Sequence, residues 1–171
     1  MKRILKILAV LVLVGAIALA VAISHNSACP NGPAASPVAS GTAAMQAAVY
    51  RCYGGPEVVQ IETIEKPVPA DDEVLVQVRA AAVNPLDWHY LRGEPYLMRL
   101  SSGFGRPKDT RIGVDYAGVV VAVGRNVTRF KQGDEVFGGR SGTLAEYVAV
   151  RESRNIVPKP ARLSFEQAGS V

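Results

Sequence analysis

The segment DEVLVQVRAAAVNPLDWHYLRG, residues 72–93, contains the strongest local signals for the fold. Between residues 74 and 78 a valine stands at every second position, which is the period of a strand that buries one face. The alternation ends at Asn84, a residue type that caps helices, and Pro85 follows at a position suited to the first helical residue. We therefore predict a long strand that passes, at Pro85, into a short helix ending near Arg92.

Short strands separated by turns make up most of the sequence from Met45 onward. Glycine-containing turns such as VGRN and KQGDE lie between runs rich in β-branched residues. The predicted strands lie at residues 45–53, 58–69, 72–83, 116–123, 135–137 and 144–150, with a loop at 101–110. This pattern predicts a mainly β domain with short helices, folded as a partly open barrel rather than as a parallel sheet.

Charge and composition exclude several classes of function. The chain has 171 residues and a net charge of +4, but Lys2, Arg3 and Lys6 precede every acidic residue. The remaining sequence is nearly neutral and lacks the concentrated basic face that binding of nucleic acid requires. It also lacks a Gly-x-Ser-x-Gly motif and a glycine-rich phosphate turn after a strand. The two cysteines, Cys29 and Cys52, define neither a disulfide framework nor a zinc cluster.

The N-terminal segment has the composition of a membrane-spanning helix. Residues 7–23 carry no charge, and at about 1.5 Å per residue the apolar stretch from Ile4 crosses about 30 Å of hydrocarbon. We predict a single-pass anchor over residues 1–23 that contacts the lipid bilayer through residues 4–23. A cleavable signal peptide is the alternative, and the length of the apolar segment favours the anchor. Because the basic residues lie on its N-terminal side, the positive-inside rule predicts that the rest of the chain is exported.

Residues 24–44 separate the predicted anchor from the folded module. They contain no Asp, Glu, Lys or Arg and are rich in Ala, Ser, Pro and Gly. A segment of this composition buries too little apolar surface to fold and behaves as a flexible tether. We therefore predict a flexible linker over residues 24–44 and a folded domain over residues 45–171.

The C-terminal sequence LSFEQAGSV indicates the start of a helix. Ser164 and Gln167 have the spacing of a capping box, in which each residue satisfies the backbone N–H of the other. Only seven residues follow Ser164, whereas an isolated helix needs about 12 or more. We therefore expect these residues to belong to a longer chain. A C-terminal turn packed on the barrel is the alternative.

Four segments together resemble one protein family: VYRCYGGPEVVQIE, DEVLVQVRAAAVNPLDWHYLRG, GVDYAGVVVAVGRNVTRFKQGDEVFGG and AEYVAV. They are similar to the N-terminal catalytic domain of the medium-chain dehydrogenase/reductase superfamily, and within it to the zinc-free quinone oxidoreductase group. The resemblance covers nearly all of residues 45–171 and implies a GroES-like barrel. It also implies a Rossmann domain that would begin shortly after Val171, so the domain is expected to be truncated before it.

The resemblance implies a reaction without a metal ion. In zinc-dependent members of the superfamily a cysteine stands at the position of Asn84, and a Gly-His-Glu segment stands at residues 113–115, which here are Gly-Val-Asp. Without zinc to polarise a carbonyl, the implied reaction is hydride transfer from NADPH or NADH to quinones or α,β-unsaturated carbonyls. Most of the cofactor seat would lie on the Rossmann domain.

Residues around the strand-to-helix junction are the candidate site. Asn84 has a carbonyl that can cap the helix and an amide free to donate to a ligand, and the resemblance implies a catalytic residue that contacts substrate or nicotinamide. His89 matches a family position near the cofactor, as a proton relay or cofactor contact; a half-buried polar residue is the alternative. Asp87 is expected to orient the turn. Aromatic residues that could form a wall for a flat substrate, or else simply pack, are Trp88, Tyr90 and Tyr96.

Two functions from different classes remain open. The first is the catalytic-domain portion of a membrane-anchored NAD(P)H-dependent oxidoreductase, expected to be inactive as this chain alone and to form a homodimer at full length. The second is a non-catalytic membrane-anchored binding module or truncated remnant. Export of the domain counts against a simple version of the oxidoreductase function, because exported domains meet little NAD(P)H.

Overall fold

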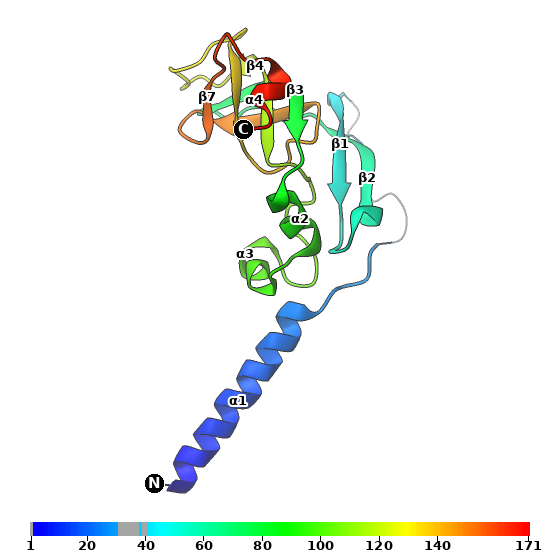
Figure 1. The fold of residues 1–171 in the computed structure, drawn as a ribbon, viewed down its shortest axis with the longest axis vertical. Helices are drawn as coiled ribbons and strands as arrows, with labels where there is room; N and C mark the ends of the chain where they lie inside the picture. The colour runs from blue at the N-terminus through cyan, green and yellow to red at the C-terminus, as the bar shows by residue number, and fades with distance from the viewer. Residues whose placement is uncertain (1, 31–37, 39–40) are drawn as a thin grey trace.

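The structure is a computed structural model and describes residues 2–30, 38 and 41–171. A long N-terminal helix, α1 (Lys2–Ser24), projects from one end of a mainly β domain (Figure 1). The elements of the domain are β1 (Ala44–Tyr50), η1 (Pro56–Val58), β2 (Val59–Glu65), β3 (Glu73–Ala82), α2 (Pro85–Arg92), η2 (Tyr96–Met98), α3 (Arg99–Ser102), β4 (Asp115–Val123), β5 (Glu135–Gly139), β6 (Tyr147–Arg151), β7 (Ile156–Pro158) and α4 (Phe165–Ala168).

The main sheet has five antiparallel strands in the order β6-β3-β4-β5-β7. The predicted alternation is confirmed in β3, where Val74 and Val76 are fully buried and Val78 packs against the same core. Two register shifts between β3 and β4 add irregularity that bends the sheet, so that it curls into half of a barrel. Its core consists of Val74, Val76, Tyr116, Val120, Phe130, Val136, Val148, Val150 and Ile156.

A second sheet, made of β1 and β2, extends the curl. The two strands pair antiparallel from Ala44 opposite Glu65 to Tyr50 opposite Val59. An isolated bridge between Ala47 and Ala145 joins this hairpin to the segment that leads into β6. The result is the mainly β, partly open barrel with short helices that the sequence predicts.

The boundaries of several predicted elements differ from those observed. The predicted strand over residues 58–69 ends at Glu65, because the prolines that follow cannot donate to a sheet. The predicted strands over 45–53 and 144–150 are β1 and β6, which are shorter. The predicted loop over 101–110 begins inside α3, and β7 was not predicted because three residues are too few to show a period.

The short helix α4 carries the predicted capping box. The backbone N–H of Gln167 donates to Oγ of Ser164 at 3.2 Å, and that of Ser164 donates to Oε1 of Gln167 at 3.0 Å. The helix packs against β3 and β4, and Ala168 is buried there. Local capping and tertiary packing therefore act together in these few residues.

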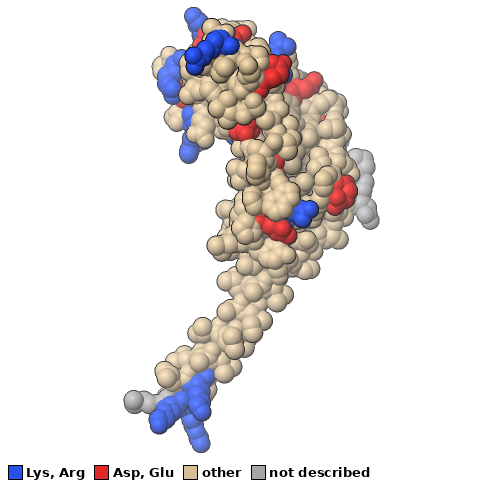
Figure 2. Space-filling view, in the orientation of Figure 1, with Lys and Arg blue, Asp and Glu red and all other residues tan. Residues whose placement is uncertain are grey.

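Helix α1 is long and apolar enough to cross a membrane, a description that a signal sequence near an N-terminus also satisfies. None of its residues is buried by the rest of the chain. The only charged side chains in it, those of Lys2, Arg3 and Lys6, gather at its N-terminal end, where Figure 2 shows them in blue. The apolar remainder of the helix is exposed except at its C-terminal end, where Ile23 is half-buried.

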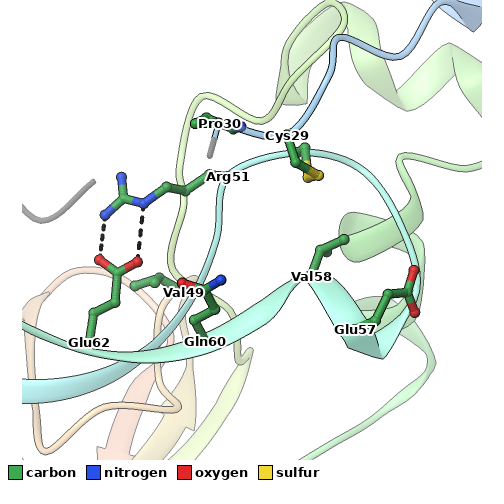
Figure 3. Close-up of a pocket in the computed structure, with 9 residues that line it drawn as sticks. Cys29, Pro30, Val49, Arg51, Glu57, Val58, Gln60 and Glu62 are labelled. Atoms are coloured by element: carbon green, nitrogen blue, oxygen red, sulfur yellow. Dashed lines mark hydrogen bonds and ion pairs between the residues drawn. A yellow bond between two sulfur atoms is a disulfide. The ribbon is translucent and has the colours of Figure 1, made fainter. Parts of the chain in front are cut away.

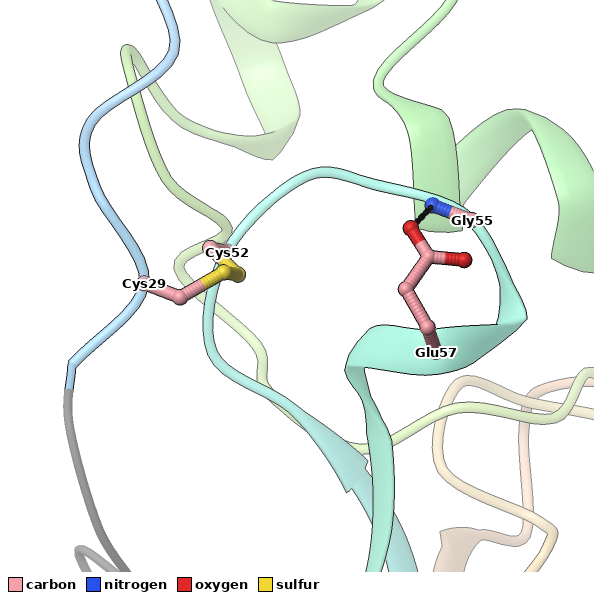
Figure 4. Close-up of a disulfide and its surroundings, with 4 residues drawn as sticks. All are labelled: Cys29, Cys52, Gly55 and Glu57. Atoms are coloured by element: carbon pink, nitrogen blue, oxygen red, sulfur yellow. Dashed lines mark hydrogen bonds between the residues drawn. A yellow bond between two sulfur atoms is a disulfide. The ribbon is translucent and has the colours of Figure 1, made fainter.

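Cys29 and Cys52 form a disulfide, which corrects the expectation that these cysteines define no cross-link (Figure 4). Their Cα atoms lie 5.1 Å apart, within the ordinary range for a disulfide. The pairing depends on residues 25–29 running back along the domain, where the backbone N–H of Ser27 donates to the carbonyl of Gly105 at 2.9 Å. The first residues of the predicted linker are therefore attached to the domain, and residues 31–37 and 39–40 lie outside the described part.

Candidate active site at the strand-to-helix junction

Asn84 connects the end of β3 to α2 as the predicted helix cap. Its Oδ1 accepts from the backbone N–H of Leu86 at 2.7 Å, and its own N–H donates to Oδ2 of Asp87 at 2.9 Å. Pro85 begins the helix, and Gly93 ends it in the left-handed conformation with φ of 62°. The local sequence thus defines both ends of α2, and the prediction of this helix is confirmed.

The side-chain amide of Asn84 is not entirely free, contrary to the expectation from the sequence. Its Nδ2 donates to Oδ2 of Asp115, the first residue of β4. The pairing of Ala82 with Asp115 in the β3–β4 register brings this carboxylate beside the end of β3. An amide nitrogen has two hydrogens, and the structure describes no second acceptor for the one that remains. Hydrogen bonds at its backbone nitrogen, its Oδ1 and its Nδ2 thus fix the orientation of Asn84, and one side-chain N–H donor is left for a ligand.

Asp87 is the buried member of this cluster, with 1% of its surface exposed. One carboxylate oxygen accepts from Asn84, whereas Oδ1 has no hydrogen-bond partner among the described residues. Burial raises the pKa of the Asp87 carboxyl, the N–H of Asn84 opposes that rise, and the nearby charge of Asp115 adds to it. Asp87 contacts the backbone of the turn, which is the orienting position expected from the sequence.

We expect Asp87→Asn to become more stable relative to the wild type as the pH rises from acid toward neutral. The folded-state pKa of Asp87 is raised above its ordinary value of 3.8. The Asp87 carboxyl therefore contributes fully to the stability of the wild type below pH 3.8, and this contribution is lost as the pH rises through the folded-state pKa. Asparagine cannot ionise and can still accept from Asn84. Urea unfolding of both proteins across the acidic range measures the difference in unfolding free energy.

The exposed Asp71→Asn variant is the control for removing one carboxylate from the chain. It should not reproduce the rising difference. A difference between Asp87→Asn and wild type that stays constant or falls with pH would contradict the assigned burial effect.

His89 lies half-buried in the middle of α2. Its Nδ1 is 2.6 Å from the carbonyl oxygen of Glu94, which can only accept, so Nδ1 carries the proton. The ring meets that of Trp88 edge-on, with centroids 4.7 Å apart. In the neutral tautomer Nε2 is then an acceptor, and the described residues give it no hydrogen bond. This geometry leaves His89 able to bind an N–H or O–H group of a ligand.

The three predicted aromatic wall residues are not gathered in one place. Trp88, on α2, is 45% exposed, and the guanidinium of Arg92 lies 5.1 Å from its ring. Tyr90 is half-buried on the same helix. Tyr96 lies beyond the C-terminal end of α2, with the guanidinium of Arg99 4.7 Å from its ring. Only Trp88 therefore combines large exposure with a place on the helix that Asn84 caps.

Arg99 is a buried residue that none of the sequence motifs indicates. It is 1% exposed, and its guanidinium donates to the carbonyls of Gly93 at 2.8 Å and Arg92 at 3.0 Å. It also donates to the carbonyls of Ile23 at 3.1 Å and His25 at 3.2 Å. Arg99 therefore joins the end of α2 to the end of α1. No local pattern could indicate this, because the acceptors are backbone groups up to 76 residues away.

A small hollow beside the disulfide is a weaker candidate for a ligand site (Figure 3). Its volume is about 120 Å³, whereas ligand pockets usually measure about 300 Å³ or more. Two of its charged groups are already paired, since Nε and Nη2 of Arg51 contact the carboxylate of Glu62 at 3.2 and 2.5 Å, and the third, Glu57, accepts from the backbone N–H of Gly55 at 2.8 Å. The hollow is lined by Cys29, Pro30, Val49, Arg51, Cys52, Glu57, Val58, Gln60 and Glu62.

Within residues 2–30, 38 and 41–171, no three or more His, Cys, Asp or Glu side chains come together as a metal-binding group. At the junction itself the neighbours of Asn84 in the fold are the carboxylates of Asp87 and Asp115. Val114, between Gly113 and Asp115, presents an aliphatic side chain.

A family model described as the alcohol dehydrogenase GroES-like domain matches residues 70–161, more than half of the chain. The chain belongs to this family. The matched range begins before β3 and ends before α4, so Asn84, His89 and Asp115 all lie within the GroES-like domain. The family identified from the sequence motifs is therefore confirmed.

Similar proteins include oxidoreductases that are much longer than this chain. An NADPH-dependent alkenal/one oxidoreductase of Arabidopsis thaliana chloroplasts is 38% identical over 74% of this chain and 34% of its own length. A quinone oxidoreductase of Sus scrofa is 35% identical over 78% of this chain and 39% of its own length. The structure of the quinone oxidoreductase from Coxiella burnetii matches with a TM-score of 0.66 and 27% identity, over 75% of this chain and 41% of that one. The GroES-like chain thus corresponds to well under half of these relatives.

Proposed function

We propose that this chain is the catalytic-domain portion of a membrane-anchored, zinc-independent, NAD(P)H-dependent oxidoreductase that transfers hydride to quinones or α,β-unsaturated carbonyls. The observation that carries the proposal is the fixed Asn84 amide, which the helix cap and Asp115 orient and which retains one N–H donor. The relatives named as quinone and alkenal/one oxidoreductases support the substrate class.

The chemistry of the junction fits a carbonyl acceptor. NAD(P)H supplies the hydride when it is bound. Negative charge then develops on the carbonyl oxygen of a quinone or enone, and the free N–H of Asn84 donates to that oxygen. The Nε2 of His89 accepts no hydrogen bond from the described residues, and it suits the carboxamide N–H or a ribose hydroxyl of the cofactor. The remaining contacts to the cofactor would come from a nucleotide-binding domain.

The surface around Asn84 suits a flat apolar substrate. Exposed apolar side chains flank the cap on both sides: Val83 is 75% exposed, Leu86 is 39% exposed and Trp88 is 45% exposed. Such groups contribute binding through burial of apolar area, whereas the few polar groups fix orientation. Trp88 is thus the aromatic wall residue in this proposal.

Helix α1 is, in this proposal, an uncleaved single-pass anchor with its N-terminus in the cytoplasm. Its exposed apolar surface supports insertion into lipid, and the basic residues at its N-terminal end support this orientation. The disulfide gives independent support for export, because such bonds persist in oxidising compartments and are rare in the cytosol.

The same disulfide favours a second candidate function, a non-catalytic membrane-anchored binding module. If the domain is exported it meets little NAD(P)H, and the Asn84 site would then bind a quinone or enone without reducing it. The two candidates share the site and differ only in whether hydride transfer follows.

The test joins the chain to the nucleotide-binding domain of a quinone oxidoreductase and measures NADPH oxidation with a quinone acceptor. We expect oxidation with the wild type and a loss of about 100-fold in kcat for Asn84→Ser, because serine keeps the helix cap and removes the N–H donor. Asn126→Ser, in the exposed turn after β4, is the matched control and should retain full activity. Saturable quinone binding without NADPH oxidation favours the binding module, and wild-type activity in Asn84→Ser would refute the assigned role.

A further inference from the structure

Residues 96–108, which include η2, α3 and the loop after them, expose an unusual number of large apolar side chains. Tyr96 is 44% exposed, Leu97 67%, Leu100 48% and Phe104 51%. These four exposed apolar side chains lie within nine residues of the sequence, and large exposed apolar regions mark contact sites. We name residues 96–108 the junction loop, because they adjoin the C-terminal end of α1; they are distinct from the strand-to-helix junction at Asn84.

The junction loop is fixed to the C-terminal end of α1. Arg99, in the loop, donates to the carbonyls of Ile23 and His25, and Gly105 accepts from the backbone N–H of Ser27. In Figure 1 the η2–α3 region lies directly beside the end of the helix. An open apolar groove between them is lined by Ala18, Val21, Ala22, His25, Ser27, Phe104 and Gly105.

The length of α1 determines where this loop would stand relative to a bilayer. The 23 residues of the helix span about 35 Å at about 1.5 Å each, against a hydrocarbon thickness of about 30 Å. A helix that crosses the bilayer therefore ends in the headgroup region. Arg99, which is hydrogen-bonded to the carbonyls of Ile23 and His25, must lie in that same region.

The charges of the junction loop agree with this location. It contains three basic residues, Arg99, Arg106 and Lys108, and no acidic residue. Arg99 is buried, whereas Arg106 and Lys108 are exposed. Basic residues beside an apolar surface suit anionic lipid headgroups. Figure 2 shows uncharged surface continuing from α1 onto the adjoining part of the domain.

We propose that the junction loop is a second lipid contact, which seats Leu97, Leu100 and Phe104 in the headgroup region around the point where α1 leaves the bilayer. Arg106 and Lys108 contact anionic headgroups. The domain is then held against the membrane in a fixed orientation and does not reorient freely about a flexible linker. This inference rests on the proposed anchoring by α1 and not on the proposed oxidoreductase activity.

Quenching of tryptophan fluorescence by brominated lipids tests the contact in the full chain, reconstituted into phosphatidylcholine and phosphatidylglycerol vesicles. All variants carry Trp88→Phe, so that each has one tryptophan. Leu97→Trp reports on the junction loop and Leu13→Trp on the middle of α1. Val68→Trp is the matched control, because Val68 is also apolar and exposed (83%) but lies in the β2–β3 loop, at the far end of the domain from α1 (Figure 1).

We expect brominated acyl chains to lower the emission of Leu97→Trp and Leu13→Trp by about twofold or more, since interfacial apolar groups reach about 5–10 Å into the acyl boundary. Val68→Trp should be unaffected. Quenching of Leu13→Trp without quenching of Leu97→Trp overturns the lipid contact and leaves the anchor intact. Equal quenching of Leu97→Trp and Val68→Trp also overturns it. Absence of quenching in Leu13→Trp overturns the anchor and this inference together, whereas the NADPH assay is independent of all three results.

Discussion

Replacing Arg99 with methionine should lower the free energy of unfolding by about 3–5 kcal/mol, at about 1 kcal/mol for each of four hydrogen bonds lost. Methionine fills much of the space but donates nothing, so four backbone carbonyls lose their partner. The substitution also removes the guanidinium from its place near two aromatic rings, those of Tyr53 at 4.3 Å and Tyr96 at 4.7 Å. Urea unfolding in detergent, followed by the fluorescence of Trp88, measures the loss.

Two further variants make this result interpretable. Arg99→Lys should recover only part of the stability, because an ammonium group cannot reproduce the planar fork that reaches carbonyls on two helices. Arg106→Met removes an exposed arginine from the same loop and should change stability little. A loss below about 1 kcal/mol in Arg99→Met would mean that water replaces the guanidinium at these carbonyls.

Removing the disulfide with the double substitution Cys29→Ser and Cys52→Ser should cost about 3 kcal/mol at 25 °C. The cross-link joins residues 23 positions apart, and a closed loop of that length restricts the unfolded chain by about this amount. Both serines are needed, because a single substitution leaves a reactive thiol. Thermal unfolding of the wild type with and without a reducing agent, compared with the double variant, measures the effect.

The reducing agent provides the internal control for the disulfide. It should lower the melting temperature of the wild type to that of the double variant and leave the double variant unchanged. A wild-type melting curve that does not respond to reduction, with both cysteines open to maleimide labelling beforehand, would show that the bond is not formed in the purified protein.

These two substitutions act on the same structural feature, the attachment of the N-terminal segment to the GroES-like domain. Arg99 joins the end of α1 to the end of α2, and the disulfide joins the following residues to the loop after β1. The candidate site at Asn84 lies at the opposite end of α2, about 13 Å from Gly93 along the helix. The orientation of the site relative to α1 therefore depends on these attachments.

The local elements of the fold were predictable from the sequence, and so were two residues of the candidate site, Asn84 and His89. The capping boxes at Asn84 and Ser164 involve partners two or three residues away, so residue type and spacing suffice to indicate them. The buried face of β3 follows from its alternation in the same way. The family motifs pointed to Asn84 and His89, and the structure adds which of their atoms remain available.

By itself the sequence determined the start of α2 and of α4, the approximate positions of β1 to β6, the buried face of β3, and that α1 is long enough to cross a bilayer, because each property depends on residues within a few positions of one another. Only the tertiary structure decided that Asp115 accepts a hydrogen bond from the side chain of Asn84, that Arg99 donates to a backbone carbonyl at the end of α1, and that Cys29 forms a disulfide with Cys52. These contacts join residues 31, 76 and 23 positions apart. Their formation depends on strand register and on the path of the chain over the domain, which no local pattern encodes.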